Sequence, residues 1–206
     1  MDRADAAALD GTDPVAGFRD RFVIPDDNLV YCLGNSVGRL PAATAVRLRA
    51  VVEEEWGGEL VRGWDHWTDL PLRVGDELGA SMLGAGPGQV LVVDNTTVNL
   101  YRLAGAALAA RPGRPVIVTD RGNFPTDRYV LDEVGDVRWV DHWSDLDSAL
   151  GDDVAIVSFS LVDYRSAEIA DVAAVTSMAH DAGALVLWDL SHAAGVIPVH
   201  LDDWGA

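Results

Sequence analysis

Two polar side chains at the end of an apolar segment are the strongest candidates for chemistry in this sequence. Asp189 directly follows apolar residues 184–188, and His192 stands three residues further on. Burying a carboxylate without a partner is costly, and a protonated ring nitrogen of a cofactor is a natural counter-charge. A simpler interpretation makes Asp189 a helix N-cap and His192 a hydrogen-bonded structural residue. Both interpretations place Asp189 at the end of a buried strand.

A second candidate is a run of hydroxyl and amide side chains at residues 94–99. It follows an apolar segment and begins a helical pattern. Free backbone N–H groups at a helix N-terminus, helped by the hydroxyls of Thr96 and Thr97, can bind an anion such as phosphate. Simple capping of the helix by Asp94 or Asn95 explains the same residues.

A third candidate, residues 122–127, carries an aromatic side chain on a turn. Phe124 could stack on a flat ring, because Pro125 restricts the backbone that presents it. A hydrophobic staple at a helix start, with Pro125 as the first helical residue, is the favoured interpretation of this segment taken alone.

The elements that must position these residues alternate between strands and helices. This alternation predicts an α/β fold with a mostly parallel sheet flanked by helices. Ligands of such sheets bind beyond the carboxyl ends of the strands, where all three candidate segments fall. The expected strands are residues 89–93, 115–119, 136–140, 154–159 and 184–188, and the helices between them are residues 95–110, 125–133 and 167–181.

The chain before the first of these strands has a different character. Residues 1–30 are acidic and alanine-rich and are expected to form an N-terminal arm, so that residues 31–206 form one domain. Within that domain the apolar spacing predicts one helix that begins at Pro41 and stops at Gly57 and Gly58. A second helix is expected at residues 71–83, with a glycine-rich turn after it.

Composition restricts the partners and the compartment. The 206 residues include 15 basic and 33 acidic ones, which gives a net charge of −18 and argues against nucleic acid or an anionic membrane as a partner. The one cysteine, Cys32, cannot form an internal disulfide, and no cluster has the spacing of a metal site. The first residues do not resemble a signal peptide, and no apolar run is long enough to span a membrane, so a cytoplasmic location is expected. All 15 basic residues are arginine.

Five blocks of the sequence together resemble one enzyme family. They are YCLGNSVG at 31–38, VDNTTVNL at 93–100, NFPTD at 123–127, SLVDYRS at 160–166 and WDLSHAAG at 188–195. In this order they resemble kynureninase, a pyridoxal 5'-phosphate (PLP)-dependent enzyme with the aspartate aminotransferase fold (fold type I). The Asp-x-x-His element is shared by many PLP enzymes, whereas GNS-x-G and NFPTD are more specific to this family.

The resemblance implies a role for each candidate residue. Asp189 would pair with the pyridinium nitrogen of PLP, Phe124 would stack on the pyridine ring, and Thr96 and Thr97 would contact the phosphate. The rest of the implied cofactor site is Pro125, Thr126, Asp127, Ser160 and His192, and the residues implied to face the substrate are Asn35, Ser36 and Trp64, with Trp67 an alternative to Trp64.

The resemblance also implies an activity. Kynureninases hydrolyse L-kynurenine, or 3-hydroxykynurenine, to anthranilate, or 3-hydroxyanthranilate, and L-alanine, a step of tryptophan catabolism. They generally form homodimers with active sites near the subunit interface.

The sequence departs from the family in one respect that matters for catalysis. The family's lysine, which binds PLP covalently and follows the Asp-x-x-His block, is missing, because the chain contains no lysine and stops at Ala206. We therefore expect an incomplete PLP-binding large domain without a catalytic residue, inactive and prone to association by itself. It would need a C-terminal polypeptide to hydrolyse kynurenine. The alternatives are a non-catalytic PLP-binding or scaffold module, and a lyase similar to cysteine desulfurase or selenocysteine lyase.

Overall fold

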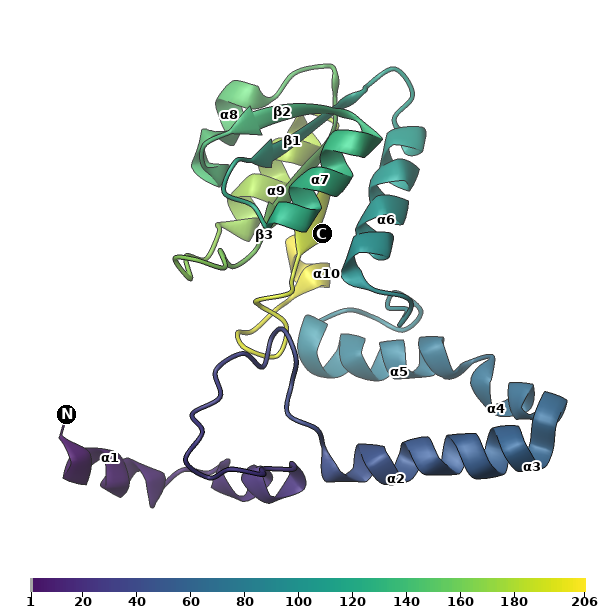
Figure 1. Ribbon diagram of the computed structural model, residues 1–206. Coiled ribbons are helices and arrows are strands. Elements are labelled where there is room, and N and C mark those ends of the chain that lie inside the picture. Colours follow the sequence, from purple (N-terminus) through teal and green to yellow (C-terminus); the bar gives the residue numbers. More distant parts are fainter. Residues whose placement is uncertain (1) are drawn as a thin grey trace. The chain divides into compact units, whose positions relative to one another are not determined.

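The computed structural model describes residues 2–206 (Figure 1), and the chain divides into two units at Thr68 and Asp69. The expected boundary at residue 30 lies inside the first unit. None of the helices formed by the described residues is long and apolar enough to cross a membrane.

The first unit is helical, and most of its side chains are exposed. The helix expected from Pro41 is present, but it does not stop at Gly57 and Gly58. Both glycines adopt helical backbone angles, and the helical path breaks at Leu60, whose φ of 55° lies outside the right-handed helical region. The elements of this unit are α1 (Arg3–Asp10), η1 (Ala16–Arg21), α2 (Ala42–Ala50), η2 (Val51–Trp56), α3 (Gly57–Glu59), η3 (Leu60–Gly63) and α4 (Trp64–Trp67).

The second unit opens with the helix that its sequence predicts. It consists of α5 (Leu70–Leu78) and η4 (Gly79–Leu83), and it ends at Gly84. Gly84 has a φ of +58°, and a Cβ atom there would lie 2.8 Å from the Cα of His200, so both the conformation and the space require glycine.

The strand expected at residues 89–93 is not formed, and that prediction is wrong. Apolar composition alone does not make a strand, because a strand also requires a neighbour for its backbone hydrogen bonds. No strand among the described residues pairs with this segment. The N–H of Val92 donates instead to the carbonyl of Pro71, and the side chains of Leu91 and Val92 are exposed.

The other four expected strands form one parallel sheet with the order β2-β1-β3-β4. Each agrees with its expected range to within one residue at either end, so the predicted α/β architecture is confirmed. The strands are β1 (Val116–Asp120), β2 (Asp136–Val140), β3 (Val154–Ser160) and β4 (Leu185–Asp189).

Helices cover both faces of this sheet. α6 (Thr96–Ala110) and α7 (Pro125–Val134) pack on one face, where Ala104 and Leu131 meet Ile117 (Figure 1). The opposite face carries η5 (Trp143–Asp145), α8 (Leu146–Ala149) and α9 (Val172–Asp181), and its core includes Val157 and Val175. The alternation of buried side chains along β1 supplies both cores. A short helix, α10 (Leu201–Trp204), follows β4.

The third crossover helix begins later than expected. The helix predicted at residues 167–181 starts at Val172, with the side chain of Asp171 accepting from the N–H of Ala174. The preceding residues turn back on the end of β3, where Val162 and Ile169 form an antiparallel bridge. The N–H of Ala170 donates to the carbonyl of Leu161, and the carbonyl of Glu168 accepts from the N–H of Asp163, so this segment bonds to the residues just after β3 in place of continuing a helix.

Candidate functional site

The carboxyl ends of β3 and β4 lie side by side. Ser160, the last residue of β3, is the register partner of Asp189, the last residue of β4. β1 pairs in parallel on the other side of β3, so the segments that follow all three strands emerge at the same edge of the sheet. This is the edge at which the sequence predicts a ligand site.

A cavity of about 540 Å³ in the second unit brings together residues from three candidate segments. Thr96 comes from the start of α6, Asp127 from the first turn of α7 and Asp189 from the end of β4. The remaining lining is largely apolar. It consists of Leu78, Leu83, Asn99, Leu100, Leu103, Leu187, Trp188, Leu190, Ser191 and Ala194.

A local turn orients the carboxylate of Asp189. Its Oδ1 accepts hydrogen bonds from the backbone N–H of Ser191 at 2.8 Å and from the Ser191 hydroxyl at 2.6 Å. Its Oδ2 lies 3.2 Å from the Oγ of Ser160. The side chain thus caps a turn, as the simpler interpretation holds, and it also contributes to the cavity wall.

Asp127 places a second carboxyl group at the same cavity. It is only 3% exposed, and burial, with a smaller contribution from the negative charge of Asp189, raises its pKa from 3.8 to about 6. Among residues 2–206 no arginine forms an ion pair with either Asp127 or Asp189. A cationic group in the cavity would relieve the repulsion between the two carboxylates.

The start of α6 has the geometry of a capped helix N-terminus. The side chain of Asn95 accepts from the N–H of Val98 at 3.0 Å, so Asn95 is the N-cap. Both threonines are exposed, and Thr96 is part of the cavity lining whereas Thr97 is not. The positive end of the helix dipole and the Thr96 hydroxyl together suit an anionic group.

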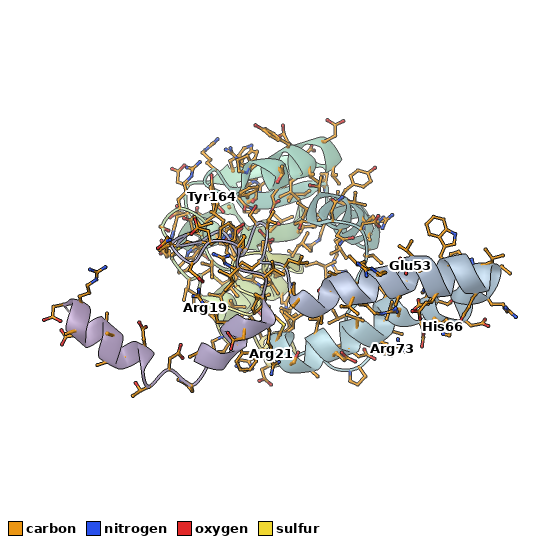
Figure 2. The ribbon with its side chains drawn as sticks, turned by 60° about the horizontal axis from the view of Figure 1, so that its bottom comes forward. Arg19, Arg21, Glu53, His66, Arg73 and Tyr164 are labelled. Atoms are coloured by element: carbon orange, nitrogen blue, oxygen red, sulfur yellow. The ribbon has the colours of Figure 1, made fainter. Side chains whose placement is uncertain are left out.

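Phe124, Pro125 and Thr126 are not part of the cavity lining. Pro125 is the first residue of α7, as expected, and Thr126 is exposed. The ring of Phe124 is 39% exposed and meets the ring of Tyr164 edge-on, with centroids 5.1 Å apart. Tyr164, labelled in Figure 2, also lies near His192, with ring centroids 6.3 Å apart.

Asn123 is a site residue to which the sequence reasoning assigns no role. It is 3% exposed, and its Oδ1 accepts from the N–H of Phe124 at 2.7 Å and from the Ser160 hydroxyl at 2.9 Å. Its Nδ2 donates to the Oγ1 of Thr119 at 3.1 Å. Asn123 therefore ties the end of β1 to the end of β3. The available signal is its place in the NFPTD block, three residues beyond the end of a buried strand.

The residues expected to face a substrate belong to the first unit. Trp64 is 61% exposed, and its ring meets that of Trp67 edge-on at 6.0 Å. Trp67 is held in place, because its Nε1–H donates to Glu55 at 2.7 Å, and Glu55 also pairs with Arg47. The nearby His66, labelled in Figure 2, pairs with a glutamate of the same unit. The substrate-facing roles of Asn35, Ser36 and Trp64 remain predictions.

Comparison with solved structures defines the class of fold. The complex of the cystine C-S lyase C-DES with cysteine persulfide has a TM-score of 0.71 at 15% identity, covering 86% of this chain and 51% of that one. A NifS-like protein has a TM-score of 0.66 at 19% identity, covering 83% and 51%. The structure of another C-DES form carries glycine covalently linked to its PLP cofactor. The chain has the fold of the fold type I PLP-dependent enzymes, as its sequence predicts.

Within that class, the chain is similar in sequence to kynureninases. The kynureninase of Pseudomonas fluorescens is 40% identical over 99% of this chain and 52% of the relative. That of Burkholderia pseudomallei strain 1106a is 41% identical over 97% of this chain and 51% of the relative. The predicted resemblance is confirmed, and the chain spans about half the length of the curated relatives it matches. No family model matches the chain.

Proposed function

We propose that this chain binds PLP in the cavity formed by α6, α7 and β4, and that it supplies the cofactor site of a kynureninase-type hydrolase. The substrate would be L-kynurenine or 3-hydroxykynurenine, and the products anthranilate or 3-hydroxyanthranilate and L-alanine. The curated relatives named kynureninase support the family, and the cavity supports the cofactor.

One observation carries the proposal: Asp127 and Asp189 line one cavity, and burial and mutual repulsion raise the pKa of Asp127. A heteroaromatic ring with a protonated nitrogen supplies the missing positive charge. The cavity volume of about 540 Å³ lies in the range of small-molecule sites. The residues present therefore fit the cofactor.

Each side chain then has a physical task. Asp189, held by Ser191, would accept the ring N–H and keep the nitrogen protonated. Thr96 and the first amides of α6 would bind the phosphate. When bound, PLP supplies an electron sink for a substrate carbanion, which no protein side chain provides. The rest of the proposed cofactor contacts are Thr97, Phe124, Pro125, Thr126, Asp127, Ser160 and His192.

Covalent attachment of PLP through a side chain requires a lysine, and the 206 residues contain none. We propose that this chain alone binds PLP non-covalently, and that hydrolysis requires a polypeptide corresponding to the half of its relatives that it does not match. Self-association of the chain and a cytoplasmic location are part of the same proposal. Light scattering coupled to size exclusion tests the association, and a monodisperse monomer would contradict it.

The decisive experiment measures binding before activity. PLP is titrated into the 206-residue chain by calorimetry, with Asp189→Asn as the comparison. Binding by the unsubstituted chain that weakens by about tenfold or more in the variant supports the proposal. A folded chain that does not bind PLP would leave only a scaffold role.

Activity is tested by co-expressing the chain with the unmatched C-terminal half of the Pseudomonas fluorescens relative. We expect anthranilate release from L-kynurenine by the pair and none by the chain alone. Sulfide release from cysteine serves as the comparison reaction, since some structural neighbours are sulfur lyases by name. Release of sulfide without anthranilate would favour the lyase alternative over kynurenine hydrolysis.

A further inference from the structure

The hydroxyl group of Ser160 has one proton and two neighbouring acceptors. Its Oγ lies 2.9 Å from the Oδ1 of Asn123 and 3.2 Å from the Oδ2 of Asp189. O–H···O hydrogen bonds have lengths of about 2.5–3.0 Å, so the distance to Asn123 falls within the ordinary range and the distance to Asp189 falls beyond it. Asn123 is therefore the nearer of the two acceptors of the Ser160 proton.

The amide of Asn123 has one orientation that satisfies all of its contacts. Its Oδ1 must be an oxygen, because the N–H of Phe124 donates to it at 2.7 Å. Its Nδ2 then faces the Oγ1 of Thr119, a fully buried hydroxyl group, at 3.1 Å. Since the side chain is itself buried, these bonds fix the oxygen that receives the Ser160 proton.

We propose that Asn123 is a positioning residue that keeps the Ser160 hydroxyl proton away from Asp189. The Oδ2 of Asp189 then remains an acceptor for the protonated ring nitrogen of the cofactor. Its other oxygen, Oδ1, is already occupied by the two donors of Ser191. This inference rests on the proposed function and adds a residue that acts on the cofactor through Ser160.

The inference predicts a ligand-selective effect. In Asn123→Ala the Ser160 hydroxyl loses its nearer acceptor and turns to Asp189, so a cationic ring must displace it. We expect about tenfold weaker binding of a ligand with a protonated ring nitrogen, because a hydrogen bond to a charged group is lost or exchanged. A ligand without that nitrogen has no such competition.

The experiment uses two probes with the full 206-residue chain. Pyridoxine 5'-phosphate has an alcohol in place of the aldehyde, so it cannot react with the N-terminal amine. Its 1-deaza analogue has C–H in place of the ring nitrogen. Both are titrated by calorimetry into the unsubstituted chain, Asn123→Ala and the double variant Asn123→Ala/Ser160→Ala. Asn28→Ala, at an exposed asparagine of the first unit, is the matched control.

The expected result is a tenfold loss for pyridoxine 5'-phosphate in Asn123→Ala and no loss for the deaza analogue. In the double variant the ratio of the two affinities should recover to that of the unsubstituted chain, because any lost Ser160 contact affects both probes alike. Equal losses for both probes, no loss, or no recovery would overturn the inference and leave Asn123 a packing role. If Asn123→Ala does not fold, the similarly sized Asn123→Leu makes the same comparison. If the unsubstituted chain binds neither probe, the proposed cofactor site fails and this inference fails with it.

Discussion

The carboxyl groups of Asp127 and Asp189 line the same cavity, one from the first turn of α7 and the other from the end of β4. Burial and the charge of Asp189 together raise the pKa of Asp127 to about 6. The cavity is therefore more negative above this pH, where Asp127 is ionised. The pair makes the site sensitive to pH and to the charge of its ligand.

The raised pKa of Asp127 has a consequence for stability. Below pH 3.8 the carboxyl group is protonated in the folded and unfolded chains alike, and it contributes nothing to the pH dependence. Between pH 3.8 and about 6 the unfolded chain releases its proton first, so the folded state loses stability as the pH rises. Above pH 6 the free energy of unfolding is lowered by the full amount, on the order of 1–3 kcal/mol.

Asp127→Asn should remove the loss of stability that the ionised Asp127 causes above pH 6. Urea denaturation should show a free energy of unfolding that exceeds that of the unsubstituted chain by on the order of 1–3 kcal/mol at pH 7 and by little at pH 3.5. Asp132→Asn, at an exposed position of the same helix, is the control. A gain at pH 7 no larger than the gain at pH 3.5 would show that Asp127 has an ordinary pKa.

Asp189→Asn should lower the pKa of Asp127. The substitution removes the repulsion between the two carboxylates but leaves Asp127 buried, and burial is the larger cause of the shift. The pKa should therefore fall below about 6 and remain above 3.8. Carbon-detected NMR titration of the Asp127 carboxyl group in the ligand-free chain measures it, and an unchanged pKa would mean that the two charges do not interact.

Thr96→Val should weaken the binding of a ligand that carries a phosphate and leave the binding of the same ring without a phosphate unchanged. The substitution removes a hydroxyl group at the start of α6 and preserves the shape of the side chain. We expect about tenfold weaker binding of pyridoxine 5'-phosphate and unchanged binding of pyridoxine, because one hydrogen bond to a charged group is lost. Thr12→Val, at an exposed threonine of the first unit, is the matched control. Equal losses for the two ligands would argue against a phosphate contact.

The two neighbouring tryptophans of the first unit should respond differently to substitution. Trp67→Phe removes the donor to Glu55, and we expect a loss of about 1–3 kcal/mol in the free energy of unfolding. Trp64→Phe should change it by less than about 0.5 kcal/mol, because Trp64 is exposed. Chemical denaturation followed by circular dichroism provides the measurement. A larger effect at Trp64 would assign it the structural role and leave Trp67 as the candidate substrate contact.

The parts of the fold that follow from local pattern were predictable. Strands β1 to β4 combine apolar runs with bounding turn residues, and α6 and α7 begin at an asparagine cap and a proline. Residues 89–93 have the same apolar character but no strand beside them, and residues 167–171 are drawn into contacts with the end of β3. The first error arises because a strand needs a pairing partner elsewhere in the chain. The second arises because residues 167–171 bond to the segment that follows β3, a few residues earlier, and the apolar pattern contains neither kind of contact.

The sequence predicts which residues belong to the candidate site, but not how they contact one another. The rule that ligands bind at the carboxyl ends of parallel strands points to Thr96 and Asp189, and the resemblance to kynureninase adds Asp127; all three line one cavity. Asn123 was missed as a site residue, since its importance lies in accepting from Phe124 and Ser160 at once. That arrangement depends on three-dimensional register between β1 and β3.

The strand order β2-β1-β3-β4 also determines the stage of folding at which the cavity forms. Every pair of neighbouring strands is parallel, so each is joined through a long crossover, and contacts between distant parts of a chain form slowly. The walls of the cavity come from α6, α7 and β4, and they meet only after the last crossover has closed. Ligand capture during refolding should therefore follow the recovery of helical signal, which makes the cofactor a reporter of the final step of folding.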